Sequence, residues 1–231
     1  MRILALGAHP DDLEFACGGI LLAEAERGSE MFFCVCSRGE SGTNGTPAER
    51  EAEARAAADL LGAKIEFLDL GGDAHIEGTR QNGFAIARQI RLVRPDTLLS
   101  SVTSVDQHPD HYVVGSLACE AMRFARYAGI AELRELPPHT VAQHFQYAVT
   151  PAAEPRGAKI RVDISAYFEK WRTLMECHPT QMRTRKYVDL QTARAQLLGR
   201  EIGVEYAQAL FMTDDLVVKS LDEIPRNVRL F

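Results

Sequence analysis

The chain has 231 residues, with 32 acidic and 26 basic side chains and a net charge of -6 at pH 7. This length fits one domain with a sizeable core, so we predict a single domain over residues 1–231. The negative balance argues against a general affinity for nucleic acid or for an acidic membrane surface. The expected partner is therefore a small molecule.

The N-terminal residues lead directly into an apolar, strand-like run, without a basic segment followed by a long hydrophobic one. No apolar run in the sequence is long enough to span a bilayer, so we expect a cytoplasmic protein. The five cysteines form an odd set without a CxxC pair, which predicts core thiols rather than disulfides or a zinc ribbon. Cys34 and Cys36 are expected to share one face of a strand.

Strand-like and helix-like stretches alternate over the first half of the chain, which is typical of a mostly parallel sheet with crossover helices. Strands are predicted over residues 2–8, 31–37, 64–70 and 96–101. Helices are predicted over residues 18–28, 46–61 and 79–94, with stop signals at Gly28 and Pro95 and a start signal at Thr46. We therefore expect an α/β, Rossmann-like fold with helices flanking the sheet and strand order 3-2-1-4.

The second half of the chain has a weaker pattern. A helix is expected over residues 108–128, followed by strands over 140–149 and 158–164. Two further helices are expected over residues 165–178 and 192–203. The sequence shows no internal repeat or linker that would divide it.

Two charged motifs follow predicted strands. GAHPDD leaves the first strand and SVDQHPDH leaves the fourth. In a sheet of order 3-2-1-4 these two strands are neighbours, and ligands bind beyond their carboxyl ends. The motifs are therefore expected to meet at one crevice, which would hold six candidate side chains, namely His9, Asp11, Asp12, His108, Asp110 and His111.

The composition of this group favours a metal ion. Carboxylates that leave water repel one another unless a cation lies among them. A mononuclear catalytic zinc needs three protein ligands and one open position, and the remaining groups could take a proton or stabilise an oxyanion. Iron in an oxygenase, a two-metal phosphoesterase and a non-catalytic ligand-binding module stay open as alternatives. A dinucleotide site is disfavoured because the first turn lacks GxGxxG.

The stretch AHPDDLEFACGG with the later HPDH resembles the LmbE/PIG-L family of zinc-dependent N-deacetylases. Further segments that resemble the family are SRGESGTNGT, VDIS and GREIGVEYAQALF. The resemblance implies that His9, Asp12 and His111 bind zinc, with Fe²⁺ as an alternative metal. It also implies that Asp11 is the general base and that His108 assists at the oxyanion. Asp110 would contact and orient one of the histidines without itself binding the metal.

Three other residues have expected roles through the same resemblance. Arg50 resembles an arginine that binds substrate hydroxyls, although an ion pair with Glu53 on the same helix is the alternative. His178 and Gln181 match residues that line the family's site, although a capped helix end would also explain them.

The resemblance implies a small amino-sugar substrate and a deacetylation reaction. Within residues 37–46, the short sequences RGE and GT are most similar to the family branch that deacetylates N-acetylglucosaminyl malate in bacillithiol synthesis. Residues 175–190 depart from that branch, so another amino sugar or a small amide stays open. Assembly as a homo-oligomer is also open, since EYAQALF offers an apolar surface for an interface or for the core.

Overall fold

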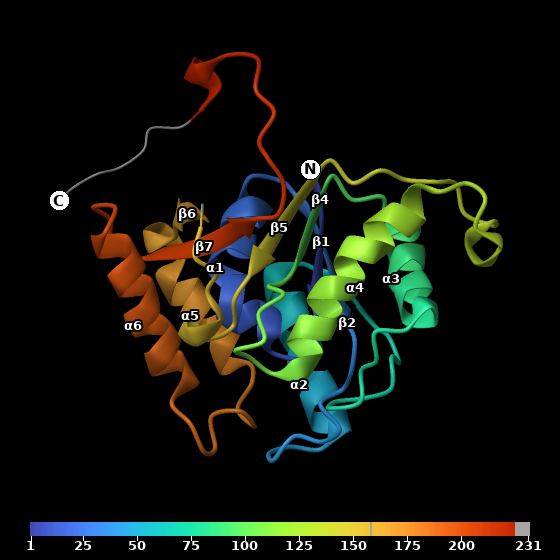
Figure 1. Ribbon diagram of the computed structural model, residues 1–231. Helices are drawn as coiled ribbons and strands as arrows, with labels where there is room; N and C mark the ends of the chain where they lie inside the picture. The colour runs from blue at the N-terminus through green and yellow to red at the C-terminus, as the bar shows by residue number, and fades with distance from the viewer. Residues whose placement is uncertain (158, 225–231) are drawn as a thin grey trace.

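A single seven-stranded sheet organises the computed structural model, which describes residues 1–157 and 159–224. The strands follow the order β3-β2-β1-β4-β5-β7-β6 across the sheet (Figure 1). Their bounds are β1 (Arg2–Gly7), β2 (Glu30–Val35), β3 (Lys64–Phe67), β4 (Thr97–Ser101), β5 (Gln143–Tyr147), β6 (Lys159–Asp163) and β7 (Ala207–Met212). Strand β6 thus matches the predicted strand over 158–164, whose first residue lies outside the described part of the chain.

The helices are α1 (Asp12–Glu26), α2 (Pro47–Leu61), α3 (Arg80–Val93), α4 (Pro109–Arg126), α5 (Phe168–Glu176) and α6 (Tyr187–Arg200). Within the described residues, no helix combines the length and the apolar character needed to cross a membrane. Thr46 caps α2 through a reciprocal pair of hydrogen bonds with Glu49, as the start signal predicted.

The predicted strand order is confirmed. Strand β1 pairs in parallel with both β2 and β4, β2 pairs in parallel with β3, and β4 with β5. Strand β7 runs antiparallel to β5 and β6. The carboxyl ends of β1 and β4 therefore lie side by side, which brings together the two charged motifs.

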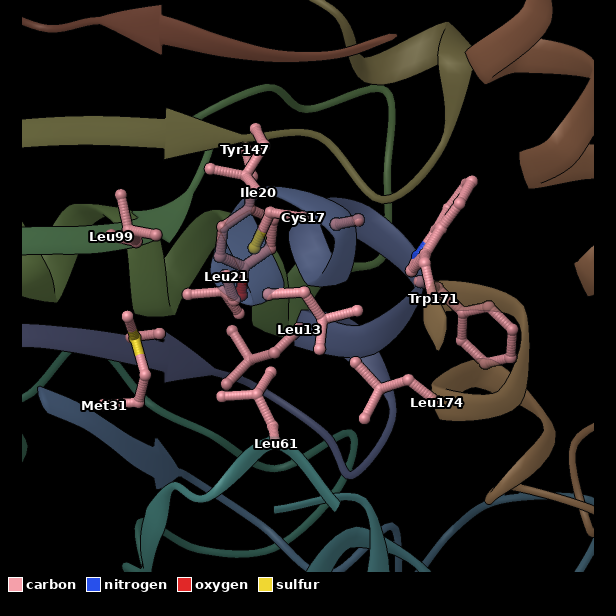
Figure 2. Packing of buried hydrophobic residues seen from close by; sticks show 14 of the residues in the cluster. Leu13, Cys17, Ile20, Leu21, Met31, Leu61, Leu99, Tyr147, Trp171 and Leu174 are labelled. Carbon is pink, nitrogen blue, oxygen red and sulfur yellow. The ribbon is translucent and has the colours of Figure 1, made fainter. Parts of the chain in front are cut away.

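Helices cover both faces of the sheet. Buried side chains of α3 and α4, such as Ile86 and Leu117, share one apolar cluster with Leu4 of β1. On the other face, Leu13 and Leu21 of α1 lie among side chains from several other elements, including Met31, Leu61, Leu99, Trp171 and Leu174 (Figure 2). Cys34 and Cys36 are buried in the first of these clusters, which confirms that they are core thiols.

Helix α1 begins at Asp12, so the prediction of a helix over residues 18–28 placed its start too late. The acidic residues Asp12 and Glu14 lie in the first turn, where the positive end of the helix dipole favours carboxylates. Gly18 lies in the middle of the helix, and a Cβ atom at this position would be 3.0 Å from side-chain atoms of Trp171 and Leu174. Gly18 thus allows α5 to approach α1 closely.

The C-terminal part also differs from the prediction. The segment EYAQALF contains β7, whose residues Ala207–Phe211 are buried, so this segment belongs to the core. Helix α6 begins at Tyr187 rather than at residue 192. A short apolar strand buried within a sheet carries no alternation that would distinguish it from a helix segment. The single domain and the homo-oligomer remain predictions.

We predict that His144 makes the stability of the fold depend on pH. This buried residue of β5 has Nε2 2.9 Å from Ser100 Oγ of β4, and burial lowers its pKa from 6.5 to about 4. Between these values the unfolded chain binds more protons, so stability decreases as the pH falls from about 6.5 to about 4. The contribution lost between pH 7 and pH 4.5 is about 2 kcal/mol. In urea unfolding at these two pH values, His144→Gln should lose this part of the dependence, and an unchanged difference would contradict the assignment.

Candidate functional site

The two charged motifs form one wall of a cleft of about 430 Å³ at the carboxyl end of the sheet. The cleft is also bordered by the loop after β2, by the loop after β3 and by the start of α6. Its lining residues include His9, Asp11, Asp12, Arg50, Asp73, His108, His111 and Gln181. Segments from distant parts of the sequence therefore build a single site.

Asp12 organises the turn between β1 and α1. Its Oδ2 accepts hydrogen bonds from the backbone N–H groups of Ala8 at 2.8 Å and of His9 at 2.9 Å. The other carboxylate oxygen, Oδ1, lies 3.0 Å from Nε2 of His111 on α4. Burial alone would raise the pKa of Asp12, but the charge and hydrogen bond of His111 outweigh burial and hold it well below its usual range. Asp12 is therefore a fixed carboxylate.

Three side chains, His9, Asp12 and His111, present donor atoms to one another closely enough to hold a metal ion. Nε2 of His111 lies 3.2 Å from Nδ1 of His9 and 3.0 Å from Oδ1 of Asp12. Ligands of a tetrahedral zinc are separated by roughly 3.3 Å, given zinc–nitrogen bonds of about 2.0 Å. The observed separations therefore fit this ion, and three protein ligands would leave one position open.

The charges around these three side chains also fit a cation. Nε2 of His9 lies 3.0 Å from Oδ2 of Asp110 and 3.1 Å from Oδ1 of Asp73. Burial alone would lower the pKa of His9, but hydrogen bonds to these two carboxylates raise it to about 10. The site thus draws a proton onto His9, as expected where buried carboxylates outnumber cations. With Nε2–H held by carboxylates, Nδ1 is directed at the ligand position, which is a common arrangement for histidines that bind metals.

Asp73 is a residue that the sequence analysis missed. It follows β3, directly after Gly71 and Gly72, and lies next to His9 and within 4.0 Å of Nε2 of His108. Asp110, which was expected to orient a histidine, contacts His9 and accepts a hydrogen bond from the backbone N–H of Ala74. A single acidic residue in a glycine-rich loop has no distinctive pattern, although its position after a neighbouring strand of the sheet was an available signal.

Asp11 is held in an unusual backbone conformation beside His9, Asp12 and His111. Its φ is 111°, a region that side-chain-bearing residues rarely adopt and that is often found where the backbone is strained for function. Nη2 of Arg50 donates to Asp11 Oδ2 at 3.1 Å and to the carbonyl oxygen of Pro10 at 3.0 Å, which fixes the turn. Burial, together with the charge of Asp12, raises the pKa of Asp11 to about 6. A carboxylate with such a pKa can accept a proton near neutral pH.

His108 differs from the other histidines of the site because it is exposed at the mouth of the cleft. Its Nδ1 accepts a hydrogen bond from the backbone N–H of Asp110 at 3.3 Å, so a neutral imidazole carries its proton on Nε2. Burial and the charge of His9 lower the pKa of His108, which favours this neutral form. His108 can therefore donate a hydrogen bond from Nε2 toward a ligand.

The structure places Arg50 in the site and contradicts its pairing with Glu53. The guanidinium of Arg50 bonds to Asp11, Pro10 and Gly39, whereas Glu53 accepts hydrogen bonds from Thr180. Gly39 has a φ of 70°, and a Cβ atom at this position would collide with Nη1 of Arg50. The loop after β2 therefore needs glycine to admit this side chain.

Gln181 and His178 occupy different environments. Gln181 lines the cleft and donates from Nε2 to the carbonyl oxygen of Asn44 at 3.3 Å. His178 has no exposed surface and lies behind the cleft, with Nε2 3.5 Å from Oε1 of Glu14. Burial alone would lower the pKa of His178, but the charge of Glu14 outweighs burial and raises it. Contact with substrate therefore remains a proposal for Gln181, and His178 could act on the site only through its neighbours.

Comparison with known sequences identifies the family. A profile described as "PIG-L: GlcNAc-PI de-N-acetylase" matches residues 4–122, which include both charged motifs. The chain therefore belongs to the PIG-L family, as its motifs predicted, and it is an enzyme of the carbohydrate de-N-acetylase class.

Individual relatives extend the likeness over most of the chain. The 4-oxalmesaconate hydratase of Pseudomonas putida is 28% identical over 92% of this chain and 87% of its own. A probable N-acetyl-alpha-D-glucosaminyl L-malate deacetylase 2 of Bacillus anthracis is 25% identical over 87% of this chain and 92% of its own. Among solved structures, the conserved protein TT1542 from Thermus thermophilus superposes with a TM-score of 0.82. It is 27% identical and covers 94% of this chain and 96% of its own.

We predict that metal binding distinguishes His111, a proposed metal ligand, from Asp11, the proposed base. His111→Ala should lose the bound divalent metal, because it removes one of three donors, whereas Asp11→Asn should retain it. Metal content is measured after purification without chelator. His75→Gln changes an exposed histidine of the loop after β3 and serves as the control, which should keep its metal. Equal metal loss in His111→Ala and Asp11→Asn would show that the ligand set is wrong.

Proposed function

We propose that the protein is a metal-dependent hydrolase that removes the N-acetyl group from an N-acetylglucosamine conjugate. The observation that carries this proposal is the group of His9, Asp12 and His111 with the separate carboxylate of Asp11 beside it. Three ligands and an adjacent base are the parts that hydrolysis by an activated water requires. Zinc is the proposed metal, with Fe²⁺ as the alternative.

The residues around the ligands supply the acid, base and oxyanion functions. A divalent metal in this position would polarise a carbonyl group and acidify a water molecule. Asp11 accepts the proton of the attacking water, and Arg50 keeps its carboxylate in place. His108 donates from Nε2 to the oxyanion that forms at the acetamide carbon. The proton taken up by Asp11 is then transferred to the departing amine, which completes the cleavage of the C–N bond.

The wall of the cleft suits a sugar. Hydroxyl and amide side chains line it, namely Ser41, Thr43, Thr150, Gln181 and Gln191. Such groups exchange hydrogen bonds with water for hydrogen bonds with sugar hydroxyls, and the aromatic ring of Tyr187 adds an apolar surface. Arg50 and Asp73 provide a fixed donor and a fixed acceptor near the metal ligands, so the glucosamine ring is proposed to lie against them.

The specific substrate that we propose is N-acetylglucosaminyl malate, as in bacillithiol synthesis. It is supported by the glycine-rich loop at residues 37–46 and by the relative from Bacillus anthracis. Arg50 from α2 enters this loop and connects it to Asp11, so the loop is part of the reaction centre.

A hydratase reaction is the second candidate, because the relative from Pseudomonas putida matches over most of both chains. A hydratase also needs a base for water, and Asp11 could serve. The inner cleft argues against a carboxylated substrate at the metal, since it presents Asp11, Asp12 and Asp73 together with Arg50, whose guanidinium already bonds to Asp11. A neutral acetamide avoids this repulsion.

We predict that the purified protein releases acetate from N-acetylglucosaminyl malate. Removal of the metal with a chelator should abolish release, and addition of Zn²⁺ should restore it, because the water is not acidic enough without a metal. Free acetate is measured by a coupled enzymatic assay. Hydration of 4-oxalmesaconate is tested in parallel, and this reaction is measured by the loss of absorbance of 4-oxalmesaconate. Hydration without any acetate release would replace the deacetylase proposal by the hydratase.

We predict that Asp11→Asn and His108→Gln each lower kcat by roughly a hundredfold or more, because each removes a group that acts on the transition state. Both side chains lie outside the metal ligand set, so metal content should be unchanged. Asp106→Asn alters an exposed carboxylate in the loop that carries His108 and should leave kcat as it is. A full loss of activity in this control, or none in Asp11→Asn, would contradict the assigned roles.

A further inference from the structure

A short basic segment lies between two residues that line the cleft. Residues 183–186 have the sequence RTRK and form the turn between α5 and α6, which we call the basic turn. Gln181 lines the cleft on one side of this turn and Tyr187 lines it on the other. All the residues of the basic turn are exposed.

The basic turn is held against the loop after β2. Nδ2 of Asn44 donates to Oγ1 of Thr184 at 2.8 Å, and Gln181 donates to the carbonyl oxygen of Asn44. In Figure 1 the connection from α5 to α6 accordingly lies at the same end of the sheet as the loop between β2 and α2. The turn is thus fixed beside the opening of the site.

Two of its cations have no acidic partner among the residues that the structure describes. Arg183 lies 3.6 Å from Oε1 of Glu49, whereas neither Arg185 nor Lys186 forms an ion pair with any residue that the structure describes. Both directly precede α6, where the positive end of the helix dipole makes cations unfavourable. These two charges therefore do not stabilise the fold. They form a locally basic segment in a chain whose net charge is -6.

The inner cleft has the opposite character. Asp11, Asp12 and Asp73 line its floor, so an anionic group of a substrate would be repelled there. A conjugate with a neutral sugar at the metal and an anionic group at the far end would avoid these carboxylates. Its anionic group would then reach Arg185 and Lys186, whose donors suit carboxylate and phosphate oxygens.

We infer that Arg185 and Lys186 form a subsite for an anionic aglycone, a carboxylate or a phosphate carried on the sugar that is deacetylated. This inference rests on the proposed function and names the part of the substrate that the basic turn selects. The two cations attract the anionic group of the substrate at the mouth of the cleft, and they do not contact the acetamide that reacts. Their effect is thus on substrate binding and on specificity, and it is reduced by salt.

The test compares three substrates with the metal-loaded enzyme: N-acetylglucosaminyl malate, N-acetylglucosamine 1-phosphate and the neutral methyl glycoside of N-acetylglucosamine. The double variant R185Q/K186Q removes both charges and keeps side chains of similar polarity. We expect kcat/KM to fall about tenfold for an anionic substrate, mainly through KM, and to stay within about twofold for the neutral one. The anionic substrate that loses more identifies carboxylate or phosphate as the preferred group. The preference should also shrink at high ionic strength.

The control is K170Q/R200Q, which removes the same charge from exposed positions on α5 and at the far end of α6. It should keep the preference for the anionic substrate. An equal loss on anionic and neutral substrates in R185Q/K186Q, or no loss on any of them, would overturn the subsite.

Binding measurements keep the subsite and the reaction apart. If the unaltered enzyme releases no acetate from any of these compounds, the proposed function has failed. Calorimetric titration with N-acetylglucosaminyl malate and with the 1-phosphate then tests the subsite alone. Weaker binding of either compound to R185Q/K186Q than to K170Q/R200Q would support it, and equal or undetectable binding to both would refute it.

Discussion

The contact between Asp12 and His111 is the interaction on which the site depends. It joins the turn after β1 to the first turn of α4, across the boundary between two parallel strands. One oxygen of Asp12 is committed to backbone N–H groups, so the other can face only the cleft. Because His9 is held by carboxylates on its opposite side, the donor atoms converge without further adjustment. Such preorganisation lowers the cost of binding a cation.

The elements around this contact serve to hold charges that the chain could not otherwise bury. Carboxylates gather from the ends of β1 and β3 and from the start of α4, and each one is hydrogen-bonded or faces a cation or a histidine. Arg50 is the buried cation among them, and its place depends on a loop that leaves room at Gly39. The backbone strain at Asp11 is maintained by the same guanidinium. Stability and reactivity are therefore coupled at this end of the sheet.

The sequence predicted the first half of the fold and the meeting of the two charged motifs at one cleft, because strong local patterns encode both. The order 3-2-1-4 follows from alternating strands and helices, and HPDD and HPDH mark the two strand ends. It did not reveal Asp73, which has no motif around it, or the partner of Arg50, which lies on a distant loop. Strand β7 was missed because its residues are buried on both faces and show no alternation.

The sequence by itself determined which chemical groups are available and which strand each group follows. Periodicity, capping residues and the spacing of histidines and carboxylates are local properties, and they can be read without a fold. Only the tertiary structure decided which oxygen of Asp12 faces the cleft, that Asp110 and Asp73 share His9, and that residues on either side of the basic turn line the same cleft. These relations depend on distances between residues far apart in the chain, and the packing of helices on the sheet sets those distances.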